Sequence, residues 1–229
     1  MELIPRAIVA GLVLPPQISF PIPSGTLPGP PIVSQEALNR VWVDVVKVYP
    51  YQGLQLQPGG GGAIFTGGLP DQAVIIQPPL VQVRDVIELD IRQLAEKVSF
   101  IFKTTAHHLG PTQPQGLGIK LIYHAPAPGR DAVKFLISQM VQQDDLEALA
   151  GGMSYDVGFK LVLESPGVIY TLALEPLRAD LTALFIDLDA QFSDATNLEE
   201  TKERIAMVDS FVRTQVRSFL ERRAEGWIA

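Results

Sequence analysis

Two carboxylates on one predicted strand are the residues best placed to do chemistry. Asp187 and Asp189 lie two positions apart in the apolar run 181–189, so a strand puts both side chains on one face. There they could share a divalent cation and position a phosphate, as the acidic pair of nucleotidyltransferases does. Those enzymes also have a glycine-rich helix start upstream, but the distance from residues 151–152 and a predicted hairpin at 159–174 do not match that arrangement. The alternative is a strand end entering a polar turn, and on that ground we assign no metal ligand.

The three histidines are a second set of possible metal ligands. His107 and His108 end a predicted helix, and His124 ends a predicted strand. Adjacent residues on a helix point about 100° apart, so two neighbouring histidines rarely bind one ion together. We expect helix-end and surface roles for them, because a partly charged imidazole is favourable near the last carbonyls of a helix.

Glycine and serine motifs add no catalytic centre. The glycine run 59–62 lacks the lysine and hydroxyl of a phosphate-binding loop, and the glycines at 116–118 open a strand instead of a helix. Ser154, Ser165 and Ser210 lack the context of a nucleophile elbow. The sequence therefore predicts no catalytic residue, no cofactor-binding residue and no cofactor.

The composition is that of a globular protein. Of 229 residues 47% are hydrophobic and 19% are charged. The absence of cysteine excludes disulfides, thiol catalysis and cysteine-bound zinc, and it suits a reducing compartment. A net charge of −7 argues against a general nucleic-acid binder, whose affinity comes mainly from phosphate contacts.

Membrane and secretion signals are not expected. No apolar run approaches the ~18–20 residues of a membrane span. The run 7–14 is preceded by Glu2 and Arg6, which offset each other, and is followed directly by Pro15-Pro16. That pattern favours a strand over a secretory signal. We expect a cytoplasmic protein that does not bind membranes.

The elements that must position these residues indicate an α+β fold. Short β-rich runs separated by glycine and proline predict strands, and longer runs with apolar residues every three or four positions predict helices. The predicted strands are 7–14, 41–49, 53–57, 63–66, 72–77, 80–83, 117–124, 159–163, 168–174 and 181–189. The predicted helices are 85–109, 131–149 and 197–224, and a proline-rich strap occupies 15–31.

These elements fall into two halves of similar order. Residues 1–112 form a strand-rich half with the strap and the first long helix, and residues 113–229 form an α+β half with the C-terminal helix. The fold class is therefore antiparallel sheet packed against long amphipathic helices. A duplication would give this order, and so would similar packing without common ancestry.

The C-terminal helix has a wide apolar face. Asn197 is a natural N-cap, acids crowd the first turns and arginines the last, and Gly226 is a natural stop. The central apolar stripe consists of Leu198, Ile205, Val212, Val216 and Phe219. Met207, Val208 and Phe211 widen that stripe. A helix of this kind contacts two things: its own sheet and either a neighbouring helix or a second copy of the chain in a homo-oligomer.

The second half resembles a scattered bacterial family of uncharacterised proteins. The resemblance rests on the strand 118–123, the hydrophobic-Asp-hydrophobic-Asp strand 185–189 before an acidic-to-basic last helix, and the proline-rich segment 29–32. The chain has His124 where that family has an aromatic-Asn pair. The resemblance implies a bacterial protein and the same architecture, and it implies no activity.

Three functions are compatible with these observations. The leading hypothesis is a non-enzymatic binding or assembly protein that uses the helix flank or a cleft between sheet and helix. One alternative is a metal-dependent phosphate-handling enzyme centred on Asp187 and Asp189. The other is a helix-grip-like carrier of an apolar ligand, in which a long helix closes a curved sheet.

Overall fold

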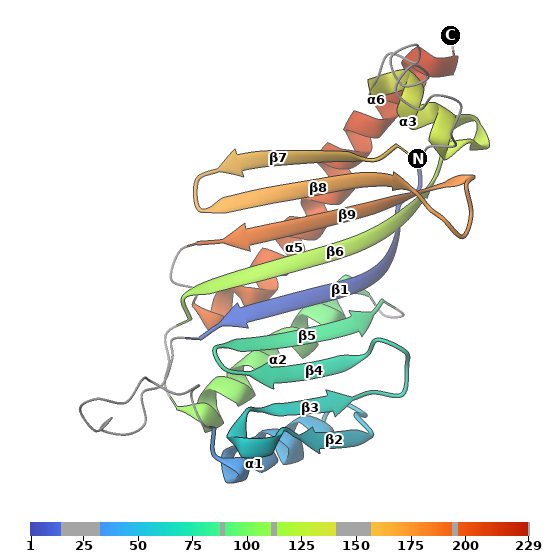
Figure 1. The fold of residues 1–229 in the computed structure, drawn as a ribbon. Helices are drawn as coiled ribbons and strands as arrows, with labels where there is room; N and C mark the ends of the chain where they lie inside the picture. The colour runs from blue at the N-terminus through green and yellow to red at the C-terminus, as the bar shows by residue number, and fades with distance from the viewer. Residues whose placement is uncertain (15–32, 88–89, 111–113, 141–156, 194–196, 229) are drawn as a thin grey trace, which may run out of the picture. The chain divides into compact units, whose positions relative to one another are not determined.

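A nine-stranded antiparallel sheet with long helices forms the fold, so the predicted α+β class is confirmed (Figure 1). A computed structural model describes residues 1–14, 33–87, 90–110, 114–140, 157–193 and 197–228.

The strand order is β2-β3-β4-β5-β1-β6-β9-β8-β7. The strands are β1 (Ile4–Val13), β2 (Gly53–Leu56), β3 (Ala63–Thr66), β4 (Ala73–Gln77), β5 (Leu80–Val86), β6 (Gly116–Pro126), β7 (Phe159–Ser165), β8 (Val168–Pro176) and β9 (Ala183–Phe192). The helices are α1 (Gln35–Val46), α2 (Ile91–Leu109), α3 (Ala132–Met140), α5 (Thr201–Phe211) and α6 (Arg217–Ile228), with a π-helical turn, η4 (Val212–Val216), between the last two.

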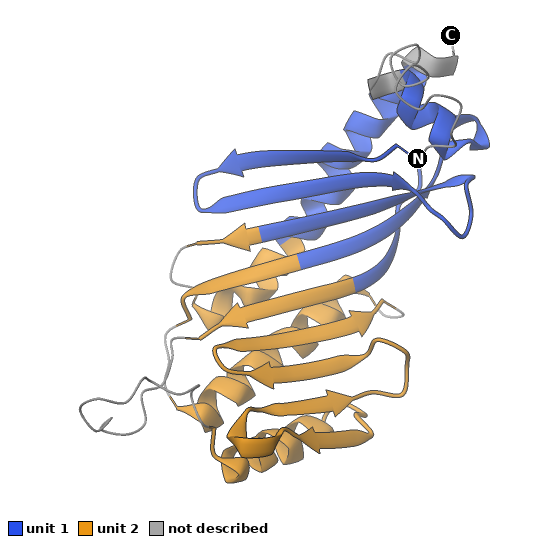
Figure 2. Ribbon diagram, in the orientation of Figure 1, with its two compact units in different colours: residues 1–7, 120–190, 207–229 blue, residues 8–119, 191–206 orange. Residues whose placement is uncertain are grey.

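The chain forms two compact units (Figure 2). Unit 1 contains residues 1–7, 120–190 and 207–229, and unit 2 contains residues 8–119 and 191–206. In the strand order the first strand of each predicted half lies beside the last strand of the same half, β1 beside β5 and β6 beside β9. The division into halves at 1–112 and 113–229 stays a prediction, as does their duplication.

Unit 2 contains the predicted meander. β2, β3, β4 and β5 pair in turn, and β3 contacts both neighbours along its whole length from Ala63 to Thr66. Glycine and proline set these boundaries: Gly62 has φ +132°, and a Cβ there would lie 1.9 Å from the Ile76 carbonyl oxygen, so only glycine fits. α1 and α2 lie on one face of this meander (Figure 1).

The prediction of a strand at 41–49 is wrong. These residues lie mostly in α1, whose N-cap Ser34 accepts a hydrogen bond from the Ala37 amide. Leu38, Val41 and Val45 are fully buried, a spacing of three and four that serves one helix face. The β-branched composition favoured a strand, but packing of this face against the unit 2 core decides the outcome, since propensity is the weaker effect.

The first long helix begins later than predicted. Residues 85 and 86 belong to β5, and α2 starts at Ile91 behind the N-cap Asp90, whose carboxylate accepts from the Arg92 amide at 3.3 Å. The apolar spacing of three and four residues continues from the end of β5 into α2, so the sequence does not mark where the strand ends and the helix begins. Residues 88 and 89 lie outside the described residues, as does the predicted strap at 15–31.

In unit 1 the part of the C-terminal helix that begins at Met207 lies on one face of β7, β8 and β9 (Figure 1). On β9 the side chains of Leu184, Ile186 and Leu188 are fully buried. The side chains of Phe185, Asp187 and Asp189 alternate with them and are partly exposed. The predicted division of this strand into a core face and a wetter face is confirmed. For the helix predicted at 131–149, the structure describes α3 at Ala132–Met140, and the predicted remainder at 141–149 lies outside the described residues.

The C-terminal helix runs without an interruption through a 3-10 turn (Leu198–Glu200), α5, η4 and α6. Asn197 accepts from the Glu199 amide at 3.1 Å, as its predicted cap role requires, and the helix continues past Gly226 to Ile228. Leu220 is buried at 1% exposure and Phe219 is only half-buried, the reverse of the predicted stripe. The π-helical turn explains this shift, because its wider turn advances the buried face by about one residue.

No described helix has the length and apolar character needed to cross a lipid bilayer.

Candidate functional site

The acidic pair lies on the sheet face of unit 1 that faces away from the C-terminal helix. Asp187 Oδ2 accepts from Lys120 Nζ of β6 at 2.9 Å, and the side chains are 20% and 38% exposed respectively. The ammonium therefore occupies the position beside the carboxylate that a divalent cation would need. Asp187 Oδ1 is buried and has no hydrogen-bond partner in the structure. Among the described residues, no group of three His, Asp or Glu side chains is arranged to hold a metal ion.

His124 lies on β6, the strand that also carries Lys120, and its ring contacts Phe185 of β9. Its ring centroid is 6.0 Å from that of Phe185. Burial, and to a lesser degree the positive charge of Arg6, lower the pKa of His124 below its usual range. The imidazole therefore stays neutral at neutral pH and behaves as a flat, weakly polar surface.

These residues belong to a larger mixed surface, which we call the sheet-face patch. Its polar part is the Lys120–Asp187 ion pair, and its aromatic part is His124 with Phe185. On β8 the same sheet face includes Ile169, which is 41% exposed and alternates with buried Val168 and Tyr170. No described helix of unit 1 covers this side of the strands (Figure 1). The patch can bind by burying apolar area, with its charges already paired.

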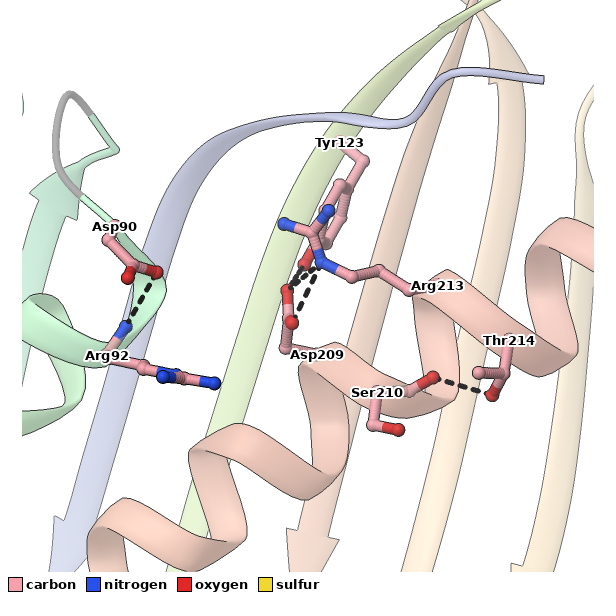
Figure 3. A network of polar contacts seen from close by, with 7 residues as sticks. All are labelled: Asp90, Arg92, Tyr123, Asp209, Ser210, Arg213 and Thr214. Carbon is pink, nitrogen blue, oxygen red and sulfur yellow. Dashed lines mark hydrogen bonds and ion pairs between the residues drawn. The ribbon is translucent and has the colours of Figure 1, made fainter.

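A buried polar network lies on the opposite face of β6 (Figure 3). The Tyr123 hydroxyl donates to Asp209 Oδ1, and Arg213 Nε donates to both Asp209 oxygens at 3.0 and 2.9 Å. Burial and the Asp209 carboxylate raise the pKa of Tyr123 far above its usual range, so the hydroxyl keeps its proton. Arg213 comes from the π-helical turn and covers the outer side of the network. The network fixes the C-terminal helix against β6 and exposes no reactive atom, because Tyr123 is fully buried.

Unit 2 contains a buried ion pair. Lys97 Nζ of α2 donates to Asp85 Oδ2 of β5 at 2.5 Å. The two side chains are buried, with exposed fractions of 6% and 4% respectively. Gln72 donates to the second carboxylate oxygen at 3.1 Å. The rings of Tyr51 and Tyr49 lie 4.8 and 5.4 Å from the ammonium. Sequence reasoning missed this cluster, although Lys97 and Asp85 both occur at core positions of their elements.

Two grooves lie between helices of unit 2. One, of about 270 Å³, is lined by Ile91, Arg92, Ala95, Glu96, Lys202, Glu203 and Ala206. The other, of about 230 Å³, lies between α1 and α2 and includes His108, whose Nε2 is 2.8 Å from Asp44 Oδ2. His108 thus pairs with a side chain of α1, a contact that the sequence did not predict. Neither groove contains the acidic pair.

The three residues predicted to widen the apolar face of the C-terminal helix differ in how deeply they are buried. Val208 is fully buried in the chain's own core. Phe211 is half-buried and stacks on Tyr170 of β8, with ring centroids 4.4 Å apart and an interplanar angle of 5°. Met207 is 42% exposed. Of the three, Met207 is the residue that can touch a partner.

Other sequence candidates are accounted for by turns and helix surfaces. Ser165 ends β7, and the Ser210 carbonyl accepts from Thr214 at 2.7 Å. The glycine run 59–62 forms a turn in which Gly59, Gly60 and Gly62 have positive φ. Ser154 lies outside the described residues.

No known family model matches this chain, and no curated protein matches it. The resemblance to a bacterial family stays a prediction.

Proposed function

We propose that this chain is a non-enzymatic binding protein that contacts a protein or peptide partner through the sheet-face patch. The observation that carries the proposal is the patch itself: a sheet face with no described helix over it, on which Ile169 is 41% exposed and the rings of His124 and Phe185 are in contact. Lys120 and Asp187 already form an ion pair, so a partner that covers them buries no unpaired charge. A mixed surface of this kind fits a protein or peptide, and the net charge of −7 opposes nucleic acid.

Site-specific photo-crosslinking in the source cells tests this proposal. A photoreactive amino acid replaces Ile169 in the patch or, as the control, Ser218, which is exposed on α6. We expect a discrete crosslinked species from position 169 and none from position 218. Equal crosslinking at both positions, or none at 169, contradicts the proposal.

A metal-dependent phosphate-handling activity centred on Asp187 and Asp189 is the alternative. The spacing of the two acids on one strand face supports it, and the Lys120 ammonium beside Asp187 opposes it. Thermal shift with magnesium and manganese separates the two proposals. Stabilisation of the parent protein that is lost in Asp187→Ala favours the enzyme, and an unchanged melting temperature favours the binding protein.

Assembly into a homo-oligomer through the C-terminal helix is a further proposal. Exposed Met207 supports it, while Val208 and Phe211 are used inside the chain. Met207→Asp is the informative variant, since it should keep the fold and disrupt only an intermolecular contact. An oligomer that is unchanged by this substitution removes the helix from consideration.

The helix-grip-like carrier of an apolar ligand is supported by the long helix across one sheet face of unit 1. Native mass spectrometry of the purified protein checks it, because a carrier should copurify with a small molecule. We place the protein in the cytoplasm of a bacterium on the basis of its cysteine-free sequence and its resemblance. Cell fractionation tests that location.

A further inference from the structure

Strand β7 ends the sheet in unit 1 and offers an unusually open edge. In the part of the chain that the structure describes, β7 pairs with β8 and no strand lies on its other side. It has seven residues, none of them proline or glycine. Val162 is 57% exposed and Leu163 is 41% exposed. Edges of this kind are templates for another strand.

The register of the β7–β8 hairpin shows which backbone groups point outward. The two-residue turn at Pro166 and Gly167 pairs Ser165 with Val168, and residues flanking such a turn form a hydrogen-bonded pair. Bonding to β8 then alternates along β7. The N–H and C=O groups of Glu164, Val162 and Lys160 therefore point to the free edge.

The residues of this edge are complementary to themselves. Lys160 and Glu164 lie two positions on either side of Val162, on the same face, and both are exposed. About 13 Å separates them along the strand, too far for an ion pair within one chain. Their cross-strand neighbours on β8 are Ala173 and Ile169, which carry no charge.

We propose that two copies of this chain pair their β7 strands in antiparallel fashion, with Val162 opposite Val162. In that register Lys160 of each copy lies opposite Glu164 of the other, which gives two ion pairs. The outward backbone groups of residues 160, 162 and 164 meet in hydrogen-bonded pairs, and Leu161 lies opposite Leu163 on the helix side. This register uses every outward group identified from the hairpin.

The other edge strand of the sheet does not offer the same match. β2 has four residues, Gly53–Leu56, and none of them is charged. A contact of seven residues is smaller than the ~1,200 Å² of a standard stable interface, so the dimer should depend on concentration. The dimer does not require the sheet-face patch to bind anything, and it uses a surface distinct from Met207.

Analytical ultracentrifugation of charge variants tests the dimer. The parent should move from 25.0 kDa to twice that mass as its concentration rises to about 0.1 mM. Lys160→Glu and Glu164→Lys each place like charges opposite each other twice, so each should weaken dimerisation by about 10- to 100-fold. Met207→Asp should leave the dimer unchanged.

Two combinations distinguish this register from a general effect of charge. An equimolar mixture of Lys160→Glu and Glu164→Lys should dimerise again, since one chain then has two acids on its edge and the other has two bases. The double swap Lys160→Glu/Glu164→Lys keeps the net charge and should restore the homodimer. Val162→Pro removes an outward N–H without touching the β8 ladder, and it should be a folded monomer.

Any of three results overturns the proposal. The first is a parent that stays at 25.0 kDa at about 0.1 mM, which would leave the edge free for some other extended partner. The second is a dimer that Lys160→Glu does not weaken. The third is a mixture of the two single variants that stays monomeric. The charge variants alter exposed positions, so they remain informative even where Val162→Pro does not fold.

Discussion

Replacing Lys97 by methionine should cost this protein a large part of its stability. Lys97 Nζ and Asp85 Oδ2 are 2.5 Å apart, a separation at which the attraction is about 7 kcal/mol at an effective dielectric constant of about 20. Removing both charges from water costs several kcal/mol per ion, so the intact pair is close to break-even. Lys97→Met keeps the cost of the buried carboxylate and loses its counter-charge. We expect a loss of about 3–5 kcal/mol.

Urea unfolding followed by circular dichroism measures this loss. With an m-value of about 3 kcal/mol/M, the midpoint should fall by about 1–1.7 M. Lys103→Met is the matched control on the same helix, because Lys103 is 34% exposed and pairs with Glu199, which is 73% exposed. A surface pair of that kind is worth about 0–1 kcal/mol.

The double variant Asp85→Val/Lys97→Met tests the reasoning directly. Replacing both charges with apolar groups removes the unpaired carboxylate, and the double variant should recover to within about 2 kcal/mol of the parent. A Lys97→Met variant as stable as Lys103→Met would refute the reasoning. So would a double variant that is less stable than either single variant.

Three further outcomes follow from local geometry. Asn197→Ala removes the cap of the C-terminal helix and should lower the free energy of unfolding by about 1 kcal/mol, whereas Asn197→Ser should not. Gly62→Ala should lower the free energy of unfolding by more than about 2 kcal/mol in the same urea assay, because its Cβ would overlap the Ile76 carbonyl and strain the backbone. The lowered pKa of His124 means that the unfolded chain binds a proton more readily, so stability should fall as the pH drops below about 6.5. Melting temperatures of the parent and His124→Gln at pH 7.5 and about 5.5 should show a smaller fall for the variant.

The strands were largely predictable because this chain marks their ends with glycine and proline. β3 was predicted to the residue, and β9 was predicted with the correct buried face. α1 was not predicted, because a run rich in valine satisfies a strand and a helix equally until its packing partner is known. The start of α2 was missed for a related reason, since apolar spacing continued from β5 into the helix.

The polar clusters were beyond sequence reasoning because their members lie far apart in the chain. Tyr123 and Asp209 are 86 positions apart, and nothing local indicates that they meet. Lys120 and Asp187 are 67 positions apart, so the cation beside the acidic pair was not foreseen. A local signal did exist for Lys97, which lies in phase with the buried residues Leu94 and Ile101 of α2.

Cysteine labelling of the sheet-face patch tests the central claim of an available binding face most directly. The chain has no cysteine, so Ile169→Cys gives a single thiol that maleimide can report. We predict that this thiol labels rapidly in the purified protein and is protected in an extract of the source cells, where the partner is present. Equal labelling in both, or slow labelling of the purified protein, would contradict the claim.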